Sequence, residues 1–207
     1  MAEPSFRVPG RPTGRGQTEI MYQVRGLSPG ARSGRFVRKC KNAPVLIVLL
    51  RHAEAEERSP SGLDADRRLT ASGEMRARAA GRALSRLALS FDRILVSPLV
   101  RAQQTAALAA ETAGCRAKTI ETAALRPGAP PGEILRLLSD LPASSALLVG
   151  HQPHMGALLG HLLTGGKGPD VPMKKAALAG LQVEGAELTG PADLLFYLPP
   201  KVFEKLT

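Results

Sequence analysis

Short apolar runs alternate with segments of helical pattern over most of the chain. The apolar runs predict buried strands at 45–50, 93–96 and 145–150, and shorter runs predict strands at 117–121, 181–183 and 194–198. Between them, small apolar residues recur at helical spacing, which predicts helices at 73–89, 98–113, 131–140 and 153–164. This alternation is typical of an α/β fold of three layers (α/β/α), in which helices cover both faces of a mostly parallel central sheet.

Composition divides the chain near residue 44. Residues 1–44 are rich in Gly, Pro, Arg and Ser, carry nine basic and two acidic side chains, and have no apolar period. We expect this leader to be disordered, because it is too polar to bury a core. We favour an upstream extension without a role as its interpretation, and an arm for nucleic acid or a membrane surface is the alternative. Residues 45–200 form the predicted domain, and residues 201–207 a short tail.

Charge and cysteine content narrow the class of protein. The formal net charge is +10, of which residues 1–44 contribute +7, so the domain is only mildly basic and nucleic acid is not a predicted partner. The longest apolar run is far shorter than the roughly 20 residues that a membrane-spanning helix needs, so we expect no membrane partner. Two cysteines cannot build a disulfide scaffold, and we expect a monomer in the cytoplasm.

Cations and imidazoles follow three of the predicted strands. Arg51 and His52 come directly after the first strand, Arg101 lies shortly after the second, and His151 follows the strand at 145–150. Because ligands in such folds bind beyond the carboxyl ends of the strands, we expect these four side chains to meet at one edge of the sheet. Two guanidinium and two imidazole groups without an acidic excess predict an anion site.

The residues before Arg101 predict that it lies at a helix N-terminus. Ser97 suits the N-cap position and Pro98 the first helical position. Unpaired backbone N–H groups and the helix dipole would then add to the guanidinium in holding an anion.

A phosphoryl group suits this set of side chains, because its transfer needs an in-line nucleophile and positive groups around its oxygens. Neutral imidazole is a competent nucleophile near pH 7, so His52 could attack phosphorus while Arg51 and Arg101 hold the oxygens. His151 would supply a further donor. A phosphohistidine would form on His52, and water would release phosphate. We therefore expect no metal and no other cofactor.

Other histidines and arginines lie on the predicted helices. His154 and His161 have no carboxylate or cysteine at a matching spacing, so a metal site is not predicted, and we expect His154 at the rim of the pocket. Arg78, Arg82 and Arg86 repeat every four residues and stripe one helix face. We interpret that face as solvated, and a docking surface for an acidic partner is the alternative.

These residues stand in motifs that resemble those of the histidine phosphatase superfamily, which includes the phosphoglycerate mutases. The matching segments are, in family order, R-H-A-E at 51–54, R-R-L-T-A-S-G at 67–73, S-P-L-V-R-A-Q-Q-T at 97–105 and G-H-Q-P at 150–153. The resemblance implies a phosphoglycerate mutase-like fold. It also implies that His52 is the nucleophile and that Arg51, Arg101 and His151 complete the phosphate pocket. The short domain, without a large cap insertion, looks most like the SixA-type phosphohistidine phosphatases.

The sequence departs from the family at the general acid. The mutases and many of the phosphatases carry a glutamate in an L-x-E segment, whereas residues 125–127 read L-R-P here. Glu121 and Glu133 are the nearest candidates and neither fits the pattern, so the general acid stays unknown. An alkoxide leaving group needs a proton in the transition state, whereas a phosphorylated imidazole can be protonated beforehand. A site without the acid therefore suits phosphohistidine.

The sequence thus predicts a metal-independent phosphatase that acts through a phosphohistidine intermediate and dephosphorylates phosphohistidine on a protein partner. One alternative is a small-metabolite phosphatase of the same superfamily. Another is a non-catalytic phosphate- or nucleic-acid-binding protein that uses the basic leader. Removal of residues 1–44 separates these classes, because a nucleic-acid binder would lose its affinity and its salt dependence while a phosphatase would keep its turnover.

Overall fold

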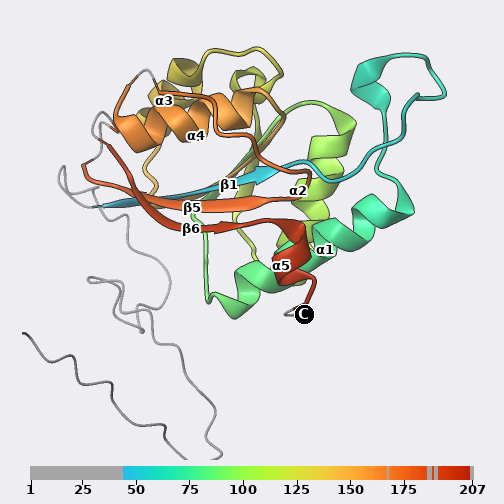
Figure 1. Cartoon of the computed structure of the whole chain (residues 1–207), viewed down its shortest axis with the longest axis horizontal. Coiled ribbons are helices and arrows are strands. Elements are labelled where there is room, and N and C mark those ends of the chain that lie inside the picture. The colour runs from blue at the N-terminus through green and yellow to red at the C-terminus, as the bar shows by residue number, and fades with distance from the viewer. Residues whose placement is uncertain (1–43, 167, 186–187, 189–190, 206–207) are drawn as a thin grey trace, which may run out of the picture. The chain divides into compact units, whose positions relative to one another are not determined.

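Six strands form one sheet in the order β3-β2-β4-β1-β5-β6 (Figure 1). The computed structural model describes residues 44–166, 168–185, 188 and 191–205. The first four strands are mutually parallel, and β5 is antiparallel to both of its neighbours, so the prediction of a mostly parallel sheet is confirmed. The strands are β1 (Val45–Arg51), β2 (Arg93–Val96), β3 (Lys118–Glu121), β4 (Ser145–Gly150), β5 (Leu178–Val183) and β6 (Asp193–Leu198).

Helices cover both faces of the sheet and make three layers. In Figure 1, α3 and α4 lie above the strands, while α1 and α5 lie below them. The helices are α1 (Ala71–Arg86), α2 (Val100–Ala113), α3 (Pro131–Asp140), α4 (His154–Thr164) and the short α5 (Pro200–Phe203), and two 3-10 turns are η1 (Asp64–Asp66) and η2 (Ala123–Leu125). In the part of the chain that the structure describes, no helix is long and apolar enough to cross a bilayer.

The central position of β1 in the sheet explains why its sequence is an unbroken apolar run. Ile47 and Leu49 pack into the core between the sheet and helices α3 and α4. Val48 and Leu50 pack into the core between the sheet and helices α1 and α2. All four side chains are buried. A strand covered on both faces has no polar positions to alternate with, which is why the run predicted a buried strand.

The structure tests the prediction for the C-terminal tail but not the prediction for the leader. The leader lies outside the described residues except for Pro44, so its disorder stays a prediction. The short tail predicted from residue 201 is corrected, because the chain stays packed beyond Pro200. Phe203 on α5 is fully buried in the core layer of α1 and α2, and the Glu204 carboxylate lies 3.1 Å from Nε of Arg76 on α1. A helix this short carries too little period to be recognised from sequence.

We expect Phe203→Ala to lower the free energy of unfolding by about 3–5 kcal/mol, because it removes a buried aromatic ring and leaves a cavity. The matched control is Val202→Ala on the same short helix, where the side chain is exposed and the cost should stay within about 0.5 kcal/mol. Urea titration followed by circular dichroism measures both. Equal midpoints for the two variants would show that α5 is not part of the folded unit.

Candidate active site

The carboxyl ends of β1, β2 and β4 meet at one edge of the sheet. Arg51 of β1 is in register with Gly150 of β4, and Val96 of β2 is in register with Val149 of β4. Parallel strands in this register deliver the residues that follow them to the same place. The residues brought together in this way are His52, Ser97 and His151.

His52 presents one ring nitrogen for chemistry. Its ring Nδ1 lies 2.7 Å from the carbonyl oxygen of Ala53. A carbonyl can only accept, so Nδ1 carries the proton and Nε2 keeps its lone pair. The backbone N–H of His52 donates to Gly150 O at 2.9 Å, and the residue is only 8% exposed. The ring is therefore fixed on the floor of the site in the tautomer that a nucleophile needs.

His151 faces His52 and is oriented by a hydroxyl. The two ring centroids lie 4.9 Å apart with the planes tilted by 50°. Nε2 of His151 lies 2.8 Å from Oγ of Ser97, and the buried Nδ1 has no hydrogen-bond partner among the described residues. The prediction that Ser97 caps the following helix is wrong, because α2 begins at Val100 with Leu99 as its N-cap residue. Ser97 instead positions His151.

Arg101 lies in the first turn of α2, as predicted, and is almost completely buried. Thr105, one turn later, accepts the backbone N–H of Ala53 at 3.0 Å and donates to Arg101 O at 2.7 Å. These two hydrogen bonds of a single hydroxyl tie the start of α2 to the residue after His52. The four-residue spacing of Arg101 and Thr105 in the third motif thus has a structural reason.

Arg51 ends β1 and is held by one of its nitrogens. Nη1 donates to the carbonyl oxygen of Met173 at 2.6 Å, while the buried Nε has no hydrogen-bond partner among the described residues. Burial lowers the pKa of this guanidinium. A half-buried cation with an unused buried donor favours an anionic ligand.

Burial keeps both site histidines neutral. It lowers the pKa of His52 to about 4, and the nearby charges of Arg101 and Arg51 act in the same direction. It also lowers the pKa of His151 to about 3, with further lowering from His52 and Arg101. The His52 imidazole is therefore unprotonated at pH 7, as attack on phosphorus requires.

We expect the domain to lose stability as the pH falls from about 6.5 towards 4. Over this range the unfolded chain protonates His52 and His151 while the folded state does not, so the unfolded state binds more protons and the free energy of unfolding decreases. The stabilisation is fully present above pH 6.5. Thermal unfolding across this pH range measures the slope. The double variant His52→Asn/His151→Asn should show a shallower slope than His161→Asn, and equal slopes would contradict the depressed pKa values.

The segment after His52 is tied to the start of α1 through the second motif. The backbone N–H of Thr70 donates to Glu54 O at 3.0 Å, and the Thr70 hydroxyl caps α1 by accepting the N–H of Gly73. A Cβ at Gly73 would overlap the Glu54 carbonyl oxygen, so only glycine permits this approach. These residues support the loop beside His52 and do not touch the phosphate pocket themselves.

An acidic side chain that the sequence analysis did not single out lies in the site. The backbone oxygen of Asp64 accepts Nη1 of Arg101 at 2.8 Å, and its Oδ2 lies 3.0 Å from Nη2. Hydrogen bonding to Arg67 and then to Arg101 holds the pKa of Asp64 below its usual range. The only sequence signal was the D-A-D segment directly before the second motif, and nothing local links it to Arg101.

The two candidate general acids lie elsewhere. Glu121 ends β3, the edge strand, where its carboxylate accepts Nε2 of Gln103 at 2.6 Å. Glu133 lies in the first turn of α3, and its charge raises the pKa of His154 against the larger lowering by burial. Among the described residues, neither glutamate bonds to Arg51, His52, Arg101 or His151. His154 is buried rather than at the rim of the pocket.

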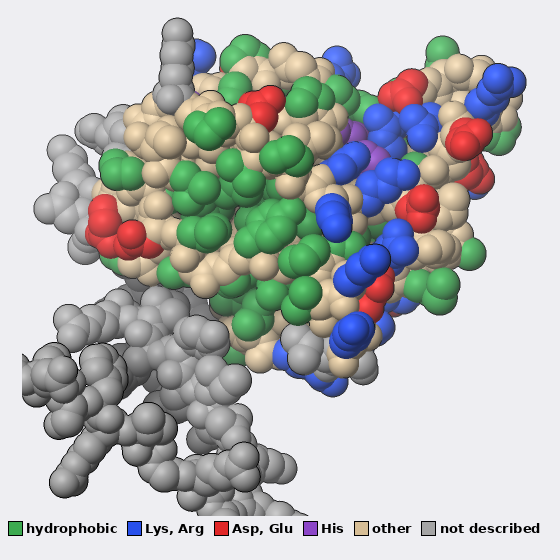
Figure 2. All heavy atoms as spheres, in the orientation of Figure 1, with side chains coloured by type: hydrophobic (Ala, Val, Ile, Leu, Met, Phe, Trp, Pro, Cys, Tyr) green, Lys and Arg blue, Asp and Glu red, His purple; other side chains and the backbone are tan. Residues whose placement is uncertain are grey.

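The surface around the site is basic. Figure 2 shows a small area of histidine at one place on this face, with Lys and Arg side chains gathered around it and continuing below. Lys175, whose charge lowers the pKa of His52, lies 3.5 Å from the Glu54 carboxylate, which also pairs with Arg76 at 3.3 Å. Such half-exposed pairs contribute roughly 0–1 kcal/mol each, so they shape the electrostatic field more than the stability.

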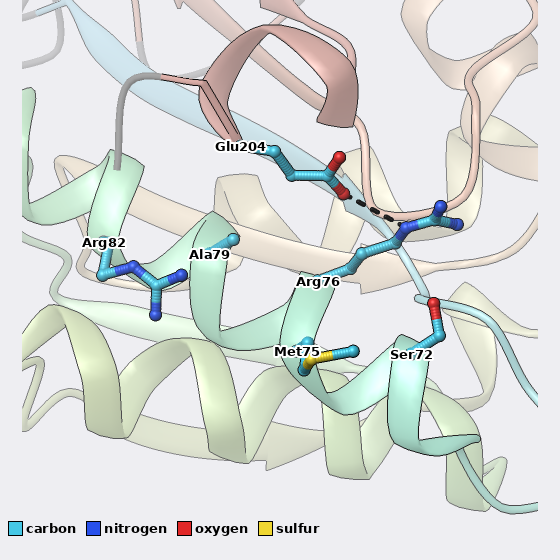
Figure 3. A pocket seen from close by; sticks show the side chains of 6 residues that line it. All are labelled: Ser72, Met75, Arg76, Ala79, Arg82 and Glu204. Carbon is cyan, nitrogen blue, oxygen red and sulfur yellow. Dashed lines mark hydrogen bonds and ion pairs between the residues drawn. The ribbon is translucent and has the colours of Figure 1, made fainter.

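A separate groove lies between α1 and α5 (Figure 3). Arg76 crosses it to reach Glu204, as the dashed line shows. The groove contains none of the four predicted site residues, and its lining side chains are those of Ser72, Met75, Arg76, Ala79, Arg82 and Glu204. Arg78 of the predicted arginine stripe pairs with Glu111 of α2 at 3.0 Å, so that part of the stripe joins two helices.

Known proteins are similar to this chain in sequence and in fold. The model of the histidine phosphatase superfamily (branch 1) matches residues 47–126. An uncharacterized protein of Picosynechococcus sp. (strain ATCC 27264 / PCC 7002 / PR-6) is 34% identical over 156 residues, which cover 73% of this chain and 93% of the relative.

Two solved structures are similar over almost their whole length. The protein histidine phosphatase SixA complexed with tungstate superposes with a TM-score of 0.69 at 22% identity, covering 79% of this chain and 100% of that one. A protein of Nakamurella multipartitia, provisionally assigned as a phosphohistidine phosphatase SixA, gives a TM-score of 0.65 at 28% identity, covering 78% and 99%. With a phosphoglycerate mutase-like fold of the SixA type, this chain is a phosphatase that belongs to the histidine phosphatase superfamily.

Proposed function

We propose that the protein is a phosphohistidine phosphatase that removes phosphate from histidine on a protein, without a metal. The tautomer of His52 carries this proposal. Its Nδ1–H donates a hydrogen bond to Ala53 O, which leaves Nε2 with a lone pair beside His151 and the two arginines. A neutral imidazole on the floor of a cationic pocket suits nucleophilic attack on a phosphoryl group.

The first step transfers the phosphoryl group to the enzyme. Nε2 of His52 attacks phosphorus, the bond between phosphorus and the substrate nitrogen breaks, and its electron pair returns to the leaving imidazole. Arg51 and Arg101 hold the phosphoryl oxygens, and Nδ1 of His151, which has no partner among the described residues, adds a donor. No proton has to move if the distal nitrogen of the substrate ring is already protonated. The charge built up on the equatorial oxygens is met by the guanidinium groups.

Water completes the reaction. It attacks phosphorus of the phosphorylated His52, the N–P bond breaks, and Nε2 recovers its lone pair. The water oxygen becomes a phosphate hydroxyl that keeps one proton, and the second water proton passes to bulk solvent. Nδ1 of His52 stays protonated and hydrogen-bonded to Ala53 O throughout, so the ring returns to the tautomer in which it started.

The state of Asp64 supports phosphohistidine over a phosphate monoester. Hydrogen bonding to Arg67 and Arg101 lowers its pKa, so it is an ionised acceptor near pH 7 rather than a proton donor for an alkoxide. In the part of the chain that the structure describes, neither Glu121 nor Glu133 makes a hydrogen bond or ion pair to the four site residues. A leaving group that needs no proton from the enzyme fits this environment best. The predicted monomeric state and cytoplasmic location stay predictions from the sequence.

Phosphate release from a histidine-phosphorylated peptide tests the proposal. The assay contains a chelator and runs beside phosphoserine and sugar-phosphate controls at equal concentration. Fast, chelator-resistant release that is selective for phosphohistidine supports the proposal. Faster release from a sugar phosphate would show that the protein is a small-metabolite phosphatase instead.

A further inference from the structure

Asp64 covers the phosphate-binding end of Arg101. Its carbonyl oxygen takes Nη1 and its carboxylate takes Nη2, so both terminal nitrogens of the guanidinium are engaged by one residue of η1. The side chain of Arg101 is 6% exposed and that of Asp64 is 61% exposed. The guanidinium therefore lies on the inner side of the pair and the carboxylate lies at the mouth of the pocket.

A second cation holds the same carboxylate. Nη1 of Arg67 lies 2.9 Å from Oδ1 of Asp64, and Nε of Arg67 donates to the backbone oxygen of Glu56. When a phosphoryl group binds the Arg101 guanidinium, the Asp64 carboxylate can release its hydrogen bond from Nη2 and keep its ion pair with Arg67. The carboxylate then stays at the mouth of the pocket rather than leaving the site.

The position of the nucleophile fixes where the leaving group departs. His52 is buried on the floor, so attack from Nε2 along the line of the breaking bond directs the leaving group outward, towards solvent. Asp64 lies on that outward side. Its charge also acts on the pKa of His151, which places it within electrostatic reach of the reacting groups.

We propose that Asp64 is a specificity-determining residue, which yields Arg101 to the phosphoryl group and then accepts a hydrogen bond from the protonated leaving imidazole. This inference rests on the proposed function. A carboxylate stabilises an imidazole ring whose distal nitrogen carries a proton, and it repels the negative charge that develops on an alkoxide or phenolate. As the N–P bond breaks, its electron pair returns to the ring, which departs neutral with the proton it brought.

Asp64→Asn tests the proposal on two substrates with opposite leaving groups. For a histidine-phosphorylated peptide we expect kcat/KM to fall about 10- to 100-fold, because the charged acceptor of the leaving ring is lost. For p-nitrophenyl phosphate, whose p-nitrophenolate group leaves without a proton, we expect kcat/KM to rise several-fold, because the carboxylate no longer competes with the substrate for Arg101. Asp64→Glu keeps the charge and should recover part of the activity on the peptide.

Asp66→Asn is the matched control. Asp66 belongs to the same turn, but its carboxylate accepts from Ser61 at 2.6 Å and not from Arg101. It should leave both rates unchanged. Equal losses on both substrates for Asp64→Asn would overturn the inference, since they would show that Asp64 only holds Arg101 in place. Wild-type protein that hydrolyses p-nitrophenyl phosphate but not the phosphohistidine peptide would instead overturn the proposed function, and the inference with it.

Discussion

His52→Ala is expected to abolish phosphate release, with a loss of about 10⁴-fold or more in kcat. The side chain supplies the atom that forms the covalent intermediate, and alanine has no lone pair to take its place. Removing a nucleophile costs far more than removing one oxyanion donor, because the remaining groups can only polarise a substrate that nothing attacks. Rates are measured by phosphate release under saturating substrate.

His161→Ala is the matched control for His52→Ala. This histidine lies in the last turn of α4, outside the set of side chains brought to the strand ends, and its loss should leave kcat within twofold. Circular dichroism and thermal unfolding establish that both variants are folded. More than a few per cent of wild-type activity in folded His52→Ala would mean that another group attacks phosphorus.

Arg101→Lys is expected to lower kcat/KM by roughly 10²- to 10³-fold although it keeps the charge. The guanidinium offers two parallel donors to two phosphoryl oxygens, whereas the lysine ammonium is a point charge on a flexible chain. The Arg101 guanidinium is also buried and bonds Asp64 through both of its terminal nitrogens, a geometry that a single ammonium cannot reproduce. The partner carboxylate of Asp64 is mostly exposed, so it is hydrated again and the fold should lose little stability.

Anion binding gives Arg101→Lys a second readout that needs no turnover. A ligand that binds only the folded state raises its stability by mass action, by about 2.7 kcal/mol at a hundredfold excess over Kd. We expect tungstate or phosphate to raise the melting temperature of the wild type and to raise that of Arg101→Lys much less. Arg78→Lys, which lies on α1 and pairs with Glu111, should keep the full shift. Identical shifts in all three proteins would place the anion somewhere other than at Arg101.

Strands that are buried on both faces could be predicted from sequence, because burial removes their polar positions. β1 and β4 matched their predicted ranges to within one residue. β5 was predicted only from residue 181, whereas it begins at Leu178. Its first half is built from Leu178, Ala179 and Gly180, which have weak strand propensity, and pairing with β1 and β6 makes it a strand. Tertiary pairing of this kind leaves no mark on a single sequence.

The site could be predicted only where its residues follow strands. Arg51, His52 and His151 are reached by counting from an apolar run, and Arg101 by counting into a helix that opens after one. Asp64 comes from a 3-10 turn in the long connection between β1 and α1, where no periodicity relates it to α2. Its contact with Arg101 depends on how that connection folds back through Thr70 and Gly73. The role of Ser97 was misjudged for a similar reason, since a partner distant in sequence, His151, takes its hydroxyl.

The most direct measurement is capture of the phosphorylated enzyme. Wild-type protein is mixed with a histidine-phosphorylated peptide, quenched within a single turnover under alkaline conditions, and mapped by mass spectrometry. We expect one phosphoryl group on His52, stable to base and lost in acid, and no phosphoryl group on His52→Ala. Rapid phosphate release with His52 unmodified at every quench time, or a phosphoryl group on a different residue, would contradict a mechanism that runs through phosphohistidine at His52.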